Sequence, residues 1–272
     1  MVSGSARVAG VIGWPVAQSR SPVLHGHWLR RYGIDGAYVP LAVPPDVLEA
    51  AVRGLHAAGF RGLNVTLPHK VAVMSLCDRV DDAARRIGAV NTLLFSPAGI
   101  EGRNTDGIGF VASLEAALDI LPAGPALVLG AGGAARAIAA ALLDRGMAVT
   151  VCNRSPERAE ALAAALPGVQ TLPWDVRAQV LGGFGLLVNT TQLGMAGQPP
   201  LDLALDAASA GLVVADIVYV PRQTPLLAAA RARGLRTVGG IGMLLHQAAP
   251  GFAAWFGVVP VVDQALQDAV LG

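Results

Sequence analysis

Short apolar runs alternate along the chain with longer helix-like segments, and this alternation is the first guide to the fold. In the first half it predicts strands at residues 8–12, 37–41, 62–65 and 92–95, and helices at 22–32, 46–58 and 81–87. Strands that alternate with helices in this way are typical of α/β proteins with mainly parallel sheets.

A second series of the same kind fills the middle of the chain. It predicts strands at 126–129, 148–151, 169–172, 186–188, 213–215 and 236–238, separated by helices such as 134–145 and 156–166. This order is typical of a Rossmann-like, doubly wound sheet. A helix expected at 243–256 comes too late to join that sheet, so we expect it to return to the first half of the chain.

A glycine-rich turn joins the strand at 126–129 to the helix that follows. The turn reads Gly130-Ala131-Gly132-Gly133-Ala134, in which Gly130 permits a tight turn and Gly132 lets the main chain approach a pyrophosphate. The helix start adds unpaired N–H groups and the positive end of the helix dipole. Such turns also serve plain packing, so this spacing alone is weak evidence for a dinucleotide site.

The end of the next strand helps to identify the cofactor. An NAD site places Asp or Glu there for the ribose hydroxyls, whereas this chain has Asn153, Arg154 and Ser155, followed by Arg158. The alternative is a solvated helix start, but two arginines there oppose the helix dipole unless an anion binds them. We therefore expect the additional phosphate of NADP.

Composition narrows the range of partners. The chain has 272 residues, a net charge of +1 and no long basic run, so neither nucleic acid nor an anionic membrane is an expected partner. Although 53% of the residues are hydrophobic, Gly, Pro or a charge interrupts each apolar run before it reaches membrane-spanning length. The N-terminus lacks the features of a signal peptide, so the expected location is cytoplasmic.

The cysteines and histidines show no metal-binding pattern. Cys77 and Cys152 are expected to be reduced structural thiols, and the five histidines are scattered without ligand spacing. We expect no metal site.

Lys70 is the main candidate for proton transfer. It ends the segment Asn64-Val-Thr-Leu-Pro-His-Lys70, which follows a strand and therefore lies where open α/β sheets bind ligands. Interconversion of a ketone and an alcohol by hydride requires a proton at the oxygen, which an ammonium can supply. The alternative is a surface lysine at a helix start, where a cation is locally unfavourable.

Other polar residues near predicted strand and helix ends could complete a site. Asp106 could hold the Lys70 ammonium or simply cap the following helix, and Asn91 could bind hydroxyls or simply form a turn. Ser19 and Ser21, beside a helix start, could bind a carboxylate, although Ser21 is also a good cap. For Gln247, a ligand contact and a packing role both stay open.

These features predict two domains with a ligand in the cleft between them. The substrate-binding and catalytic domain spans residues 1–105 and is completed by 241–272, and the NADP-binding Rossmann domain spans 106–240.

Taken in order, the motifs resemble those of the shikimate dehydrogenase family over nearly the whole chain. The matching segments are Ser19–His25, Asn64–Lys70, Gly88–Thr92, Asn104–Gly107, Gly130–Ala134, Asn153-Arg154 and Gly242–Gln247. The resemblance implies NADPH-dependent, reversible reduction of 3-dehydroshikimate to shikimate, a step toward chorismate and the aromatic amino acids.

The resemblance also implies roles for individual residues. Lys70 and Asp106 would form the catalytic pair, and Ser19 and Ser21 would hold the substrate carboxylate. Further substrate contacts would come from Thr66, Asn91, Asp106, Tyr219 and Gln247. The cofactor would be bound by Gly130, Ala131, Gly132, Gly133, Ala134, Asn153, Arg154, Arg158, Thr190, Ile217 and Gly240, with Asp82 as a weaker contact across the cleft.

Two departures from the family pattern concern specificity. Gln192 and Leu193 are bulkier than the residues usual in their loop, and the segment around Tyr219 differs from the family's more common, aromatic-rich sequence. Quinate and aminoshikimate dehydrogenases share most of these motifs and remain alternatives, as does a non-catalytic NADP-binding module. A methylene-tetrahydrofolate dehydrogenase is disfavoured because only 5% of the residues are aromatic. The expected assembly is a monomer or homodimer.

Overall fold

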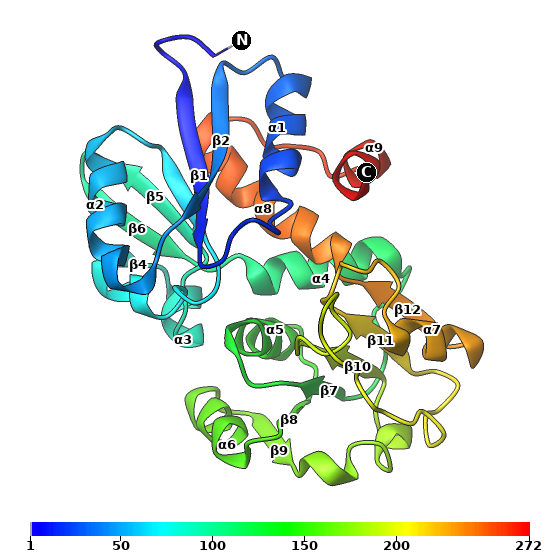
Figure 1. Cartoon of the computed structure of the whole chain (residues 1–272). Helices are drawn as coiled ribbons and strands as arrows, with labels where there is room; N and C mark the ends of the chain where they lie inside the picture. The colour runs from blue at the N-terminus through cyan, green and yellow to red at the C-terminus, as the bar shows by residue number, and fades with distance from the viewer. Residues whose placement is uncertain (1) are drawn as a thin grey trace. The chain divides into compact units, whose positions relative to one another are not determined.

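The computed structural model describes residues 2–272, which form two compact units (Figure 1). The first unit contains the described residues up to Thr105 together with Leu245–Gly272, and the second contains Asp106–Leu244. Helix α8 (Ile241–Phe256) begins in the second unit and ends in the first, so the boundary predicted after residue 240 lies four residues before the observed one.

The first unit is built on a six-stranded sheet with the order β2-β1-β3-β5-β6-β4. Strands β1 (Arg7–Gly13), β2 (Gly36–Ala42) and β3 (Gly62–Val65) are parallel, as predicted. In contrast, β5 (Thr92–Ser96) runs antiparallel to β3 and to β6 (Gly99–Arg103). Only two residues separate β5 from β6, which suffices for a hairpin but not for a parallel crossover.

The hairpin strand β6 and the short strand β4 (Arg79–Val80) were not predicted. β4 has only two residues, and the β6 sequence Gly-Ile-Glu-Gly-Arg lacks the β-branched and apolar run that marked the other strands.

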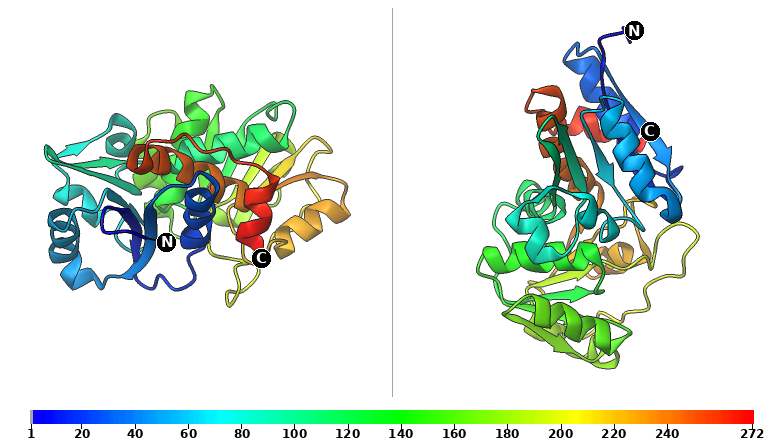
Figure 2. Two further views of the ribbon diagram at one scale, coloured as in Figure 1. Left: turned by 90° about the horizontal axis from the view of Figure 1, so that it is seen from above. Right: turned by 90° about the vertical axis from the view of Figure 1, so that its left-hand side faces the viewer.

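The helices of the first unit pack on two clusters, one mainly aliphatic and one aromatic. They are α1 (Ser21–Arg31), α2 (Leu48–Ala57), α3 (Asp82–Ile87), the second part of α8 and α9 (Gln264–Leu271). Helices α2 and α3 pack on the aliphatic cluster, and α1 and α8 pack on the aromatic one. Figure 2 shows α1 beside α9, and α1 also packs on β2. The rings of His25, Trp28, Tyr38, Phe252 and Trp255 contact one another in the aromatic cluster.

The second unit is an entirely parallel, six-stranded sheet with the order β12-β11-β10-β7-β8-β9. Its strands are β7 (Ala126–Leu129), β8 (Val149–Cys152), β9 (Val169–Leu172), β10 (Leu186–Asn189), β11 (Val213–Asp216) and β12 (Arg236–Gly239). This order confirms the doubly wound prediction, and each strand begins and ends within one residue of its predicted bounds.

The helices of this unit are α4 (Asp106–Ala117), α5 (Gly133–Asp144), α6 (Pro156–Ala165) and α7 (Pro225–Ala232). The close packing of α4 on α5 requires Gly107, since a Cβ there would lie 2.6 Å from the carbonyl oxygen of Ala137.

No helix among residues 2–272 is both long and apolar enough to cross a membrane. The same residues contain no group of three His, Cys, Asp or Glu side chains placed to hold a metal ion.

Candidate active site

The two serines expected to hold a carboxylate lie together at the start of α1. Ser21 is the first helical residue and is buried, and its N–H donates to the Ser19 hydroxyl oxygen at 3.3 Å. Residue Arg20 stands at the cap position and makes no side-chain cap bond, so the predicted cap is not Ser21. Both hydroxyls therefore stand beside a helix N-terminus, where an anion is favoured.

Behind Ser21 lies Tyr38, on β2. A side-chain hydrogen bond joins Ser21 to the Tyr38 phenol, and the phenol donates to Asn64 Oδ1 at 2.6 Å. Burial raises the pKa of Tyr38 well above its usual value, and the bond with Ser21 only partly opposes this. The phenol is therefore protonated throughout the working pH range.

The His25 imidazole stacks on the Tyr38 ring, with centroids 3.9 Å apart and an interplanar angle of 8°. His25 is fully buried, and neither ring nitrogen has a hydrogen-bond partner among the described residues. Burial lowers the pKa of His25 to about 3, so the ring is neutral and acts as an apolar support.

Asn91, immediately before β5, makes several bonds in the first unit. Its Oδ1 accepts from the Thr105 N–H at 2.9 Å and from the Thr92 hydroxyl at 3.0 Å. Its Nδ2 donates to Thr105 Oγ1 at 3.0 Å and reaches Gln247 Oε1 at 3.4 Å. The Thr105 hydroxyl donates in turn to the Gln247 carbonyl oxygen. The structure thus brings together Asn91 and Gln247, which lie 156 positions apart in the sequence.

The loop after β3 carries Thr66 and Lys70, both half-buried. The Thr66 carbonyl accepts from the His69 N–H, and the Lys70 carbonyl accepts from the Val90 N–H at 2.8 Å. Because Val90 precedes Asn91, this main-chain bond holds Lys70 close to the amide cluster. Lys70 lies in a turn before a short 3₁₀ helix and not in the first turn of an α-helix, so no helix dipole disfavours its charge, contrary to the prediction.

Buried His69 anchors this loop. Its Nε2 lies 2.8 Å from the Val43 carbonyl oxygen, which can only accept, so Nε2 carries a proton.

The two acidic residues of the prediction occupy different surroundings. Asp106 is buried at the first position of α4, and its peptide bond joins it to Thr105. It belongs to the second unit while Lys70 belongs to the first, so their pairing stays a prediction. Asp82 is fully exposed at the start of α3, where its carboxylate pairs with Arg85 at 2.6 Å. Its contact with the cofactor likewise stays a prediction.

The glycine-rich turn of the second unit has the geometry that phosphate binding requires. Gly130 has φ +113°, and a Cβ there would lie 2.5 Å from Thr190 Oγ1. Gly132 precedes α5, and a Cβ there would meet nothing within 4 Å, so the main chain borders open space. Gly133 and Ala134, in the first turn of α5, offer N–H groups without intrahelical acceptors, and Ala131 is half-buried between the glycines.

The loop after β8 presents cations. The Asn153 amide donates to the Ser155 carbonyl at 3.0 Å, and Ser155 makes no cap bond to α6. Arg154 and Arg158 are exposed, and neither forms an ion pair with any residue from 2 to 272. Two such guanidinium groups beside a helix start favour an anion there.

A buried network fixes the loops after β10 and β11. Asn189 Nδ2 donates to Asp216 Oδ1 at 3.0 Å, and Asn189 Oδ1 accepts from the Thr191 N–H and hydroxyl. Asp216 also accepts from the Thr224 hydroxyl and the Val218 N–H. Burial raises the pKa of Asp216, and these hydrogen bonds oppose the effect.

This network sets the position of three predicted cofactor contacts. Thr190 follows Asn189, and its hydroxyl donates to the Leu129 carbonyl at 2.6 Å. The Ile217 N–H donates to the Asn189 carbonyl, and Gly240 packs so closely that a Cβ would lie 2.1 Å from the Ile217 oxygen. Thr190, Ile217 and Gly240 are therefore gathered at one edge of the sheet, while Tyr219 is half-buried in the loop after β11.

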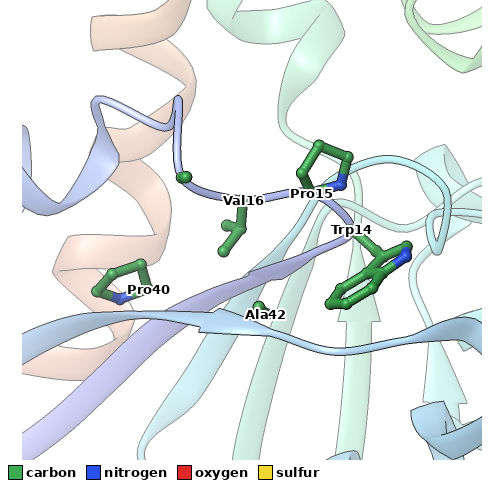
Figure 3. A pocket seen from close by; sticks show the side chains of 6 residues that line it. Trp14, Pro15, Val16, Pro40 and Ala42 are labelled. Atoms are coloured by element: carbon green, nitrogen blue, oxygen red, sulfur yellow. The ribbon is translucent and has the colours of Figure 1, made fainter.

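A separate pocket of about 580 Å³ lies in the first unit (Figure 3). Its walls are apolar and come from Trp14–Ala17 and from Pro40 and Ala42 of β2. None of the predicted site residues lines it, and no charged side chain does, so we do not assign the reaction to it.

Sequence reasoning missed the side chains that hold the site residues in place. They are Tyr38, Thr92, Thr105, Asn189 and Asp216. A polar residue within an otherwise apolar strand, such as Tyr38 or Asp216, was the one available signal.

The sequence profile of the shikimate dehydrogenase substrate binding domain matches residues 11–93, and that of shikimate / quinate 5-dehydrogenase matches residues 115–192. A shikimate dehydrogenase (NADP(+)) from Acidiphilium cryptum is 65% identical over 270 residues, which cover 99% of this chain and 98% of the relative.

Two solved structures extend the comparison. Shikimate 5-dehydrogenase from Thermus thermophilus, in complex with NADP(H) and shikimate, is 38% identical with a TM-score of 0.89, covering 97% of this chain and 98% of that chain. Quinate dehydrogenase from Corynebacterium glutamicum, in complex with NAD, is 30% identical with a TM-score of 0.91, covering 98% and 99%.

Proposed function

The chain belongs to the shikimate dehydrogenase family, and from this premise we propose that it catalyses the NADPH-dependent, reversible reduction of 3-dehydroshikimate to shikimate. One observation carries the proposal: Ser21, Asn91 and Gln247, three residues suited to a hydroxylated carboxylate, belong to one bonded cluster beside Lys70. The product serves chorismate and aromatic amino acid biosynthesis.

The second unit fits NADP. Open space beside Gly132 and the start of α5 suit a pyrophosphate, and Arg154 and Arg158, which pair with no acid among residues 2–272, suit the additional phosphate. Further contacts are proposed for residues of the same sheet edge, namely Gly130, Ala131, Gly133, Ala134, Asn153, Thr190, Ile217 and Gly240, with Asp82 as a weaker one. When bound, NADPH supplies the hydride for the substrate carbonyl carbon.

In the proposed mechanism the first unit orients the substrate and supplies the proton. Ser19 and Ser21 hold the carboxylate at the α1 N-terminus. Lys70 donates a proton to the substrate oxygen as the ketone becomes an alcohol, and in the reverse direction it accepts that proton. Asp106 holds the ammonium toward this oxygen. Hydroxyls and ring are contacted by Thr66, Asn91, Asp106, Tyr219 and Gln247.

The test is a matrix of steady-state kcat/KM values for shikimate, quinate and aminoshikimate, each with NADP and with NAD. We expect the highest value for shikimate with NADP. A higher value for quinate or aminoshikimate would identify the alternative dehydrogenases instead. Cofactor binding without turnover of any of these substrates would indicate a non-catalytic NADP-binding module.

The remaining proposals concern location and assembly. We propose a cytoplasmic enzyme, and the free thiols of Cys77 and Cys152 suit a reducing compartment. Burial raises the pKa of each thiol to about 11, which keeps both protonated and unreactive. The proposed assembly is a monomer or a homodimer, which sedimentation velocity distinguishes.

A further inference from the structure

A continuous chain of side-chain hydrogen bonds crosses the first unit and joins the carboxylate-binding end of the site to its hydroxyl-binding end. Six of its seven members, all except Gln247, are at most 7% exposed. In bonded order, this Ser21–Gln247 chain consists of Ser21, Tyr38, Asn64, Thr92, Asn91, Thr105 and Gln247. Because so little of its middle part is exposed, water cannot readily replace a missing partner there.

Main-chain groups decide which way the two amides of this chain point. The Thr105 N–H can only donate, so the Asn91 atom 2.9 Å from it must be oxygen. The Asn91 carbonyl can only accept, so the Asn64 atom 3.4 Å from it must be nitrogen. Asn64 Oδ1 is thereby turned toward the Tyr38 phenol.

These amide orientations determine the direction in which the Tyr38 and Thr92 hydroxyls donate their hydrogen bonds. Tyr38 has one hydrogen, which goes to Asn64 Oδ1 at 2.6 Å, so its oxygen accepts from Ser21. Thr92 accepts from Asn64 Nδ2 at 3.2 Å and donates its one hydrogen to Asn91 Oδ1 at 3.0 Å. Donors therefore run in the same sense from Ser21 to Asn91.

We propose that Tyr38 and Thr92 are positioning residues of the substrate site, which orient the amides of Asn64 and Asn91 so that Asn91 offers an N–H donor to a substrate oxygen. The inference rests on the proposed function, which supplies the hydroxylated substrate. Asn91 Oδ1 accepts from Thr92 and Thr105, and Nδ2 donates one hydrogen to Thr105 Oγ1 and directs the other at Gln247 Oε1, 3.4 Å away. A bound substrate oxygen would take the place of Gln247 Oε1 as the acceptor of that second hydrogen. A substrate group at this point must have a lone pair, as a hydroxyl or ketone oxygen does.

The stacked His25 ring supports this role of Tyr38. A parallel stack at 3.9 Å limits movement of the phenol ring. Replacement of Tyr38 by Phe therefore removes the hydroxyl while the ring packing stays.

The experiment compares Tyr38→Phe and Thr92→Val with two matched controls. Tyr32→Phe removes a phenol that accepts from the Val261 N–H and is no member of the Ser21–Gln247 chain. Thr92→Ser keeps the hydroxyl and removes only a methyl group. The measurements are shikimate Kd and NADP Kd by calorimetry, kcat and KM, and the melting temperature of each variant.

We expect Tyr38→Phe and Thr92→Val each to weaken shikimate binding and lower kcat/KM about 10- to 100-fold, mainly through KM. NADP Kd stays unchanged, and Tyr32→Phe and Thr92→Ser stay within about threefold of the wild type. Because both sites act through one chain, the double variant loses less than the product of the single losses.

Three results would overturn the inference. These are wild-type shikimate Kd in Tyr38→Phe or Thr92→Val, an equal loss in Thr92→Ser and Thr92→Val, or a parallel loss of NADP affinity. A wild-type protein that binds shikimate but does not turn it over would refute the proposed function alone, since the Kd series still tests the positioning role. A wild-type protein that does not bind shikimate would refute both.

Discussion

The two six-stranded sheets carry polar edges of different construction. In the first unit, buried side chains such as Asn64, Asn91 and Thr92 bond to one another, so each has a fixed donor direction. In the second unit, a glycine turn exposes main-chain N–H groups and the arginines of the β8 loop extend into solvent.

The difference suits two kinds of ligand. A hydroxylated ring requires donors and acceptors of fixed direction, which only an internally bonded cluster supplies. Phosphates require positive charge and close main-chain approach, which glycine and exposed arginine supply without a buried network. Substitutions in the two units should therefore affect different steps of the reaction, and the following predictions test that separation.

The largest effect is expected from Lys70→Ala. Loss of the proposed proton donor should lower kcat by about 10²- to 10⁴-fold, while NADP, for which we propose a site in the other unit, keeps its Kd. Stopped-flow or steady-state absorbance of NADPH gives kcat, and fluorescence titration gives Kd. Unchanged turnover would remove Lys70 from the chemistry, and a lost NADP affinity would contradict the division of labour between the units.

A smaller effect is expected from Arg154→Asp, which acts on the second unit alone. Loss of a phosphate partner and addition of a like charge should weaken NADP by about 10- to 100-fold more than NAD. The matched control is Arg236→Asp, an exposed arginine at the amino end of β12, away from the loops after β7 and β8. An equal loss for both cofactors would exclude the proposed phosphate contact.

Within the glycine turn, two alanine substitutions should separate folding from binding. Gly130→Ala forces a side chain into φ +113° and against Thr190, which should destabilise the unit by about 1–3 kcal/mol in urea unfolding. Gly132→Ala enters open space at φ −81°, so stability should hold while NADP affinity drops about tenfold. Equal NADP affinity in Gly132→Ala and the wild type would argue against a pyrophosphate there.

The smallest effect concerns the pH dependence of the first unit. Burial lowers the pKa of His25 from 6.5 to about 3. As the pH falls through 6.5, this histidine is therefore protonated in the unfolded chain but stays neutral in the folded one. The contribution of His25 to stability is nearly constant above about pH 7.5, and lowering the pH from 7.5 to 5.5 should reduce the free energy of unfolding by about 1.4 kcal/mol.

His25→Leu removes this group, so the decline between pH 7.5 and 5.5 should become shallower by that amount. His246, whose pKa burial also lowers, is retained in both proteins and cancels from the difference. Urea unfolding at the two pH values gives the comparison, and parallel slopes would show that His25 accepts a proton in the folded state.

Local features were predictable from the sequence, and the distant ones were not. The turn at Gly130 and the arginines at 154 and 158 are neighbours in the chain, so a short window contains their whole arrangement. The series of short apolar runs likewise gave the second sheet, because parallel strands cannot be joined by a hairpin turn and are separated along the chain by longer crossover segments.

Two features of the first unit could not be predicted from the local sequence. The antiparallel pairing of β5 with β6 depends on the short connection between them. The glycines and charges of β6 kept that strand from being predicted. The role of Tyr38 depends on Asn64, 26 positions away, and on an amide orientation that the Asn91 main chain sets. No periodicity or motif encodes such a contact.

The return of the chain into its first unit has a consequence for synthesis on the ribosome. Every strand of the second sheet is translated before Leu245–Gly272, the segment that brings Phe252 and Trp255 to the rings of the first unit. Until that segment emerges, His25 and Trp28 lack these aromatic neighbours and the first unit cannot close its core. The nascent protein therefore finishes its second, entirely parallel sheet before it finishes the unit that contains Lys70.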